Sequence, residues 1–117
     1  MKRDDEYLRQ LLFEIEADAE GSFSVQHYMS MPPEVEKKNY HVELLCDAGH
    51  LTRVSRSSYR MTNAGHDFLN AIRSDSIWKQ TKDALAKIGG NATLDIMKQL
   101  AVGYLKKSLS EKTGIEL

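Results

Sequence analysis

Residues 51–62 constrain the fold most, because this short β-type segment stands between two helical stretches. β-branched and aromatic residues flank Ser55-Arg56-Ser57-Ser58, a run of small and polar residues suited to a turn. Gly49 precedes the segment and suits the left-handed residue at which a helix ends. We therefore expect a two-stranded hairpin at Leu51–Thr62.

A helix, a short strand and a further helical stretch are predicted before the hairpin. Alternating apolar and polar residues predict a short strand at Phe23–Gln26. Residues 34–48 are predicted to be helical behind Pro33, either as one helix or as two helices with a turn near Lys38-Asn39. A helix from Tyr7 to Ala19 is predicted by apolar residues at i, i+3, i+4 and i+7, namely Leu8, Leu11, Leu12 and Ile15.

Capping residues and apolar stripes predict three helices after the hairpin. The first two are expected to run to about Arg73 and to Ile88, and the third to Leu109, with residues 111–117 frayed. Their caps are, in order, Thr62 or Asn63, Ser74 or Asp75, and Thr93.

The predicted order of elements is that of a winged helix-turn-helix domain: helix, strand, helix or helix pair, hairpin, then helices. The fold class is therefore mainly α with a small β-hairpin, an α+β arrangement with additional C-terminal helices. The chain has 117 residues, an ordinary length for one domain. We expect a single winged-helix-like domain over residues 1–117, with a core at about 4–73 and a C-terminal helical extension at about 74–110.

The net charge of −1 hides an uneven distribution. Residues 1–36 carry nine acidic and three basic residues, whereas residues 37–73 carry three acidic and six basic ones. Because non-specific nucleic-acid binding grows with the number of phosphates neutralised, any such binding is expected to be local and modest.

Cysteine usage and hydropathy indicate the compartment. The single cysteine, Cys46, cannot form an internal disulfide, which favours a reducing cytoplasm. No apolar run approaches the ~20 residues that span a bilayer, and the first residues lack the apolar stretch of a secretory signal. We expect a cytoplasmic protein without a membrane partner.

Several separate blocks of the chain resemble one known family. They are Met1-Lys2-Arg3-Asp4, Tyr40–Gly49, Thr62–Leu69 and Ala71–Lys79. Together they resemble a family of uncharacterised bacterial proteins, a domain of unknown function often found on phage-derived or other mobile DNA. The resemblance implies a winged-helix-like fold and no particular activity.

Three arginines on the predicted hairpin are candidate DNA contacts. Guanidinium groups of Arg53, Arg56 and Arg60 could pair with phosphates or enter a minor groove. The alternative is that they only keep an exposed hairpin soluble.

The helix before the hairpin is the candidate for the major groove. It offers Lys37, Lys38, Asn39 and His41 near its beginning. Carboxylates that would repel phosphate share this helix, so a solvated or protein-binding face is the competing interpretation; they are Glu34, Glu36, Glu43 and Asp47.

Metal, cofactor and catalytic sites are not expected. The four histidines, His27, His41, His50 and His66, lie on separate predicted elements without the short spacing that zinc ligands favour. No phosphate-binding loop or nucleophile elbow is present either.

The last two predicted helices carry more apolar surface than a minimal winged helix needs. Either the final helix folds back within the chain, or it builds a homodimer. The candidate dimer residues are Trp78, Met97, Leu100, Tyr104 and Leu105.

Two functions remain open at this point. The first is a DNA-binding regulator of phage or mobile-element origin with double-stranded DNA as its partner. The second is a non-enzymatic module that uses the same fold to bind a protein. One continuous basic patch would favour the first hypothesis, and scattered positive charges the second.

Overall fold

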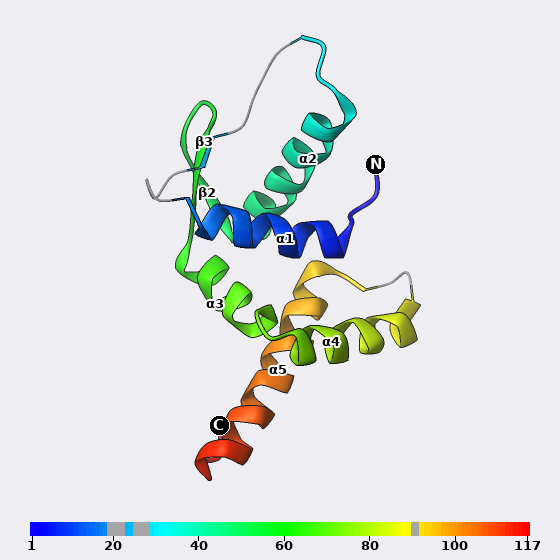
Figure 1. Cartoon of the computed structure of the whole chain (residues 1–117), viewed down its shortest axis with the longest axis vertical. Helices are drawn as coiled ribbons and strands as arrows, with labels where there is room; N and C mark the ends of the chain where they lie inside the picture. Colours follow the sequence, from blue (N-terminus) through cyan, green and yellow to red (C-terminus); the bar gives the residue numbers. More distant parts are fainter. Residues whose placement is uncertain (19–22, 25–28, 90–91) are drawn as a thin grey trace. The chain divides into compact units, whose positions relative to one another are not determined.

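The computed structural model describes residues 1–18, 23–24, 29–89 and 92–117. The described chain is mainly helical with an antiparallel β-hairpin, which confirms the predicted α+β class (Figure 1). Two compact units are present, Met1–His66 and Asp67–Leu117. Within the described part, no helix is both long and apolar enough to cross a membrane.

The first unit begins with helix α1 (Asp5–Glu16). The Asp4 carboxylate accepts a hydrogen bond from the Tyr7 amide and so caps the helix. The apolar stripe predicted from the sequence is buried. The helix ends at Glu16, three residues before the predicted Ala19, because the amide of Asp18 already bonds back to the Ile15 carbonyl and tightens the last turn. Ala19 itself lies outside the described residues.

Helix α2 (Pro33–Asp47) is one continuous helix, which decides between the two predicted alternatives. Pro33 occupies the first turn, where its missing N–H is not needed. The helix buries His41, Val42 and Leu45. Gly49 follows it with a φ of 83°, the left-handed conformation predicted for this position.

The hairpin consists of β2 (Leu51–Ser55) and β3 (Ser58–Met61), with Arg56 and Ser57 between them. The pairing is irregular between Arg53 and Ser55, so the strand bulges there. Strand β1 (Phe23–Ser24) pairs with the other side of β3, giving the order β1-β3-β2. The rest of the predicted strand, Val25 and Gln26, lies outside the described residues.

The core of the first unit lies where α1 packs on β3 and α2 packs on β2. The sheet contributes Leu51, Tyr59 and Met61, each less than a tenth exposed. Burying a Leu side chain stabilises a fold by roughly 1.5–3 kcal/mol, so these contacts outweigh the surface ion pairs described below. The face of the sheet that carries Tyr59 is therefore fixed against the helices.

A tight junction joins the hairpin to helix α3 (Asn63–Ile72). The Thr62 hydroxyl donates to the Gly49 carbonyl at 2.6 Å and accepts from the Gly65 amide at 3.0 Å. A Cβ on Gly65 would overlap the His50 carbonyl oxygen, so only glycine allows this approach. Thr62 is thus the helix cap, one of the two predicted candidates.

The second unit contains the rest of α3, helix α4 (Asp75–Ile88) and helix α5 (Leu94–Thr113). Ser74, one of the two predicted candidates, caps α4, and Thr93 caps α5, each through its side-chain oxygen. Helix α5 runs past the predicted end at Leu109, because Gly114 terminates it in the left-handed conformation. Helices α4 and α5 pack against each other.

Candidate nucleic-acid interface

Arg53, Arg56 and Arg60 are all exposed on the hairpin, but Arg53 also forms side-chain contacts with its neighbours. Arg56 stands in the two-residue turn, and Arg60 pairs with Thr52 across the ladder. Neither side chain contacts an acidic residue within the part of the chain that the structure describes. Both guanidinium groups are therefore available to a phosphate.

Arg53 makes three contacts that fix its side chain. One guanidinium nitrogen lies 3.1 Å from a carboxylate oxygen of Glu43, and the other donates to the Arg56 carbonyl at 2.6 Å. The guanidinium also lies 4.9 Å from the centre of the Tyr59 ring, its cross-strand neighbour. Arg53 thus shapes the turn and links it to α2.

Tyr59 and Glu43 complete this link. The buried phenol donates to the Glu43 carboxylate at 2.6 Å, the same oxygen that Arg53 contacts. Burial, together with the adjacent carboxylate, raises the pKa of Tyr59 from 10.0 to about 12. The hairpin is therefore tied to α2 by one carboxylate that accepts two hydrogen bonds. Tyr59 was not predicted at the site, and Glu43 was expected there only as a carboxylate that would repel phosphate. Alternation along β3 could have indicated the inward position of Tyr59, but not its partner.

The lysines at the start of α2 are ion-paired with α1. Lys37 lies 3.0 Å from the Asp4 carboxylate and 4.5 Å from the centre of the Tyr7 ring. The Tyr7 amide and then Lys37 lower the pKa of Asp4 below its ordinary 3.8. Lys38 lies 3.0 Å from Glu14. These lysines hold α2 to α1.

The other two candidates on α2 also make internal contacts. Asn39 is half-buried, and its amide nitrogen lies 3.2 Å from the Met31 sulfur. His41 is fully buried. Its Nε2 accepts from the Asp4 amide at 2.9 Å, and its Nδ1 lies 2.7 Å from the Lys37 carbonyl, so Nδ1 carries the proton and donates. The imidazole bridges α1 and α2 and has no surface for a base contact.

The exposed side of α2 is acidic. Glu34, Glu36, Glu43 and Asp47 are all exposed on this helix. Three of the predicted cations, Lys37, Lys38 and Arg53, are each balanced by a carboxylate. The positive charge therefore does not extend from the hairpin onto α2 as one patch.

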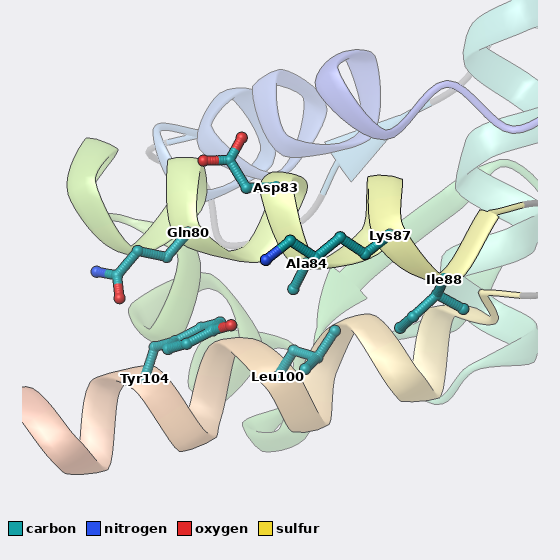
Figure 2. A pocket seen from close by; sticks show the side chains of 7 residues that line it. All are labelled: Gln80, Asp83, Ala84, Lys87, Ile88, Leu100 and Tyr104. Atoms are coloured by element: carbon teal, nitrogen blue, oxygen red, sulfur yellow. The ribbon is translucent and has the colours of Figure 1, made fainter.

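The predicted dimer residues divide into two groups in the second unit. Trp78 and Met97 are at most 3% exposed. Leu100 and Tyr104 line a groove of about 470 Å³ between α4 and α5, in which Tyr104 lies opposite Gln80 (Figure 2). Leu105 is half-buried.

Among the described residues, potential metal ligands do not gather in a cluster. In the ranges that the structure covers, no group of three or more His, Cys, Asp and Glu residues could hold a metal ion. His27 lies outside those ranges. Cys46 is half-buried, and burial raises the pKa of its thiol, which lowers its reactivity as a nucleophile.

Comparison with known proteins places the chain in an uncharacterised group. An uncharacterised protein of Haemophilus influenzae is 27% identical over 118 residues, which cover 94% of this chain and 100% of that protein. No solved structure matches the chain. Residues 2–91, most of the chain, match the family described as hypothetical protein (DUF2513). The expected membership of an uncharacterised family is thereby confirmed, and the chain belongs to the DUF2513 family.

Proposed function

We propose that this chain is a small, non-enzymatic winged-helix protein that binds double-stranded DNA through its hairpin. The order of elements supports this proposal, because helix, strand, helix, hairpin and helix follow one another as in winged-helix domains. The sheet order β1-β3-β2 agrees with it, since the first strand pairs with the second strand of the hairpin. A cytoplasmic regulator carried by phage or other mobile DNA is the setting that we propose.

The observation that carries the proposal is the pair of exposed arginines on a hairpin free of acidic residues. Arg56 and Arg60 are exposed, and residues 51–62 contain no aspartate or glutamate. Hydroxyl-bearing residues are their neighbours: Ser55 and Ser57 flank Arg56 in sequence, and Thr52 pairs with Arg60 across the ladder. Guanidinium and hydroxyl groups are the usual donors to phosphate oxygens.

This geometry limits the kind of contact. The exposed carboxylates of α2 would meet the phosphates that line a major groove, so we do not assign base readout to this helix. The hairpin would bind the phosphate backbone or enter a minor groove. The expected binding is weak, depends steeply on salt and discriminates little between sequences.

Fluorescence anisotropy of the full chain with a labelled duplex of about 25 base pairs tests the proposal. Arg56→Ala/Arg60→Ala should raise the Kd at least about tenfold at low salt and reduce the salt slope by about 2. The matched control is Lys79→Ala/Lys87→Ala, which removes two exposed cations from α4 and should leave the Kd within about twofold. Absence of binding at about 50 mM salt, or an equal loss in the control, would refute the hairpin as a DNA contact.

A second candidate, a protein-interaction module, is favoured by two observations: the positive charges are not joined in one basic patch, the outcome expected for such a module, and α2 carries exposed carboxylates. Glu36 and Asp47 are exposed on the same side of the helix and would suit a basic partner segment. A pull-down from the native host that recovers one stoichiometric protein and no DNA would support it. The charge reversal Glu36→Lys/Asp47→Lys should then abolish recovery, whereas Arg56→Ala/Arg60→Ala should not.

A further inference from the structure

One face of α5 lies open along three turns of the helix. A shallow recess of about 430 Å³ runs along it and is lined by α5 alone, at Asp95, Lys98, Gln99, Val102, Gly103 and Lys106. Of the helix's 20 residues, Met97 and Ala101 are buried. The recess faces away from these two residues, because positions 95, 99, 102 and 106 share one azimuth on a helix with 3.6 residues per turn.

Gly103 has no role within its own unit that requires glycine. A Cβ at this position would meet nothing within 4 Å among the described residues, and Gly103 does not have a positive φ. Glycine inside a helix costs about 0.5–1 kcal/mol relative to alanine. Gly103 stands with Gln99, Val102 and Lys106 at i, i+3, i+4 and i+7, the four positions that surround an inserted side chain when helices pack. The recess therefore has the form of a helix-packing site.

Two of the three charged residues that line the recess, Asp95 and Lys106, are complementary in one orientation, whereas Lys98 would lie opposite Gly103. Asp95 lies near the start of α5 and Lys106 lies 11 residues later, close to three turns and thus on the same side. In an antiparallel pair of α5 helices with its two-fold axis between positions 100 and 101, each Asp95 would face Lys106 of the second copy. A parallel pair would place like charges opposite each other. Charge pairing therefore selects a second copy of this chain in the antiparallel orientation.

We propose that α5 is an interface on which two copies of this chain pair antiparallel, with reciprocal Asp95–Lys106 ion pairs. In this arrangement Gln99 lies opposite Val102 of the second copy, and the aliphatic stem of Lys98 crosses the space that Gly103 leaves open. Three turns of paired helix bury less than the 1,200–2,000 Å² that is typical of stable complexes. The dimer is thus weak and forms at high protein concentration.

This surface differs from the apolar stripe that the sequence suggested. Trp78 and Met97 are buried within the chain and offer a second copy little area. Pairing through α5 requires neither the hairpin arginines nor DNA.

Sedimentation velocity of the full chain from about 5 to about 500 µM tests the proposal. The wild-type chain should shift from monomer to dimer across this range. Asp95→Lys alone or Lys106→Asp alone should weaken association at least about tenfold. Each substitution turns both symmetry-related 95–106 ion pairs of the dimer into pairs of like charge. Asp95→Lys/Lys106→Asp should restore it, as should a 1:1 mixture of the two single variants.

Two further variants separate pairing from folding. Gly103→Leu should block dimerisation while the circular-dichroism spectrum of the monomer is kept and its thermal midpoint is unchanged or slightly raised, because the recess is open in the monomer and leucine is a better helix former than glycine. Lys107→Asp makes the same charge change on another side of the helix and should leave the dimer unaffected. A chain that stays monomeric at the highest concentration, or a charge swap that fails to restore pairing, overturns the proposal.

Discussion

The two units use charge in different ways. In the first unit, ion pairs join distant parts of the chain: Lys37 with Asp4, Lys38 with Glu14, and Arg53 with Glu43. In the second unit, the Lys79–Asp83 pair and the Gln99–Asp95 hydrogen bond each join residues one turn apart on a single helix. The ion pairs of the first unit therefore help to fix tertiary structure, whereas these two pairs of α4 and α5 are exposed on the surface of a single helix, where they can meet a partner.

Two glycines give the largest contrast between the units. Gly65→Ala should lower the free energy of unfolding by about 3 kcal/mol, because its Cβ would strike the His50 backbone. Gly103→Ala should raise it by about 0.5–1 kcal/mol, because it adds helix propensity in open space. Urea denaturation of both variants at low protein concentration measures these changes. If both substitutions changed the free energy of unfolding equally, the backbone at the Thr62 junction would be able to move aside for the added methyl group.

Tyr59 tests how far one hydrogen bond holds the hairpin to α2. Tyr59→Phe should cost about 1.5 kcal/mol near neutral pH, because the buried hydroxyl no longer reaches Glu43. The pKa of Tyr59 is raised from 10.0 to about 12, so the stabilisation is fully present below pH 10 and is lost as the pH rises through about 12. The two proteins should therefore converge in stability between these pH values. A constant difference up to pH 12 would contradict the assignment.

The smallest expected difference in stability is between alanine substitutions of two hairpin arginines, Arg53 and Arg56. Arg53→Ala should lower stability by about 0.5 kcal/mol, since it loses an exposed ion pair and a contact with the Tyr59 ring. Arg56→Ala should change stability by less than about 0.2 kcal/mol, because its side chain is exposed at the turn. Their order should be reversed in DNA binding, where Arg56 matters more. If both variants lose stability equally, Arg56 is also structural.

Much of the fold could be predicted from local sequence signals. Ser74, Thr93 and Pro33 mark helix starts, and small polar residues mark the hairpin turn; these signals act within four residues, so one sequence reveals them. The end of α5 was missed because the apolar stripe fades at Leu109, although Gly114 behind Lys112 is a usual helix stop.

The site was harder to predict, because its contacts join residues far apart in sequence. Lys37 and Asp4 are separated by 33 positions, and His41 and Asp4 by 37. No periodicity connects such residues, so Lys37, Lys38 and His41 were grouped as surface candidates by residue type alone. The roles of these residues are decided by side-chain contacts between α2 and α1 with its cap. Such contacts are visible only in the three-dimensional structure.

The burial of Trp78 has a practical consequence. It is the one tryptophan of the chain, lies in the second unit and is 3% exposed. Indole emission shifts to longer wavelength when water reaches the ring, so intrinsic fluorescence follows the opening of residues 67–117. Far-ultraviolet circular dichroism reports on the helices of both units, whereas this emission reports on the second unit alone. Comparing the two melting curves of an unlabelled sample therefore shows whether the two units unfold together or one after the other.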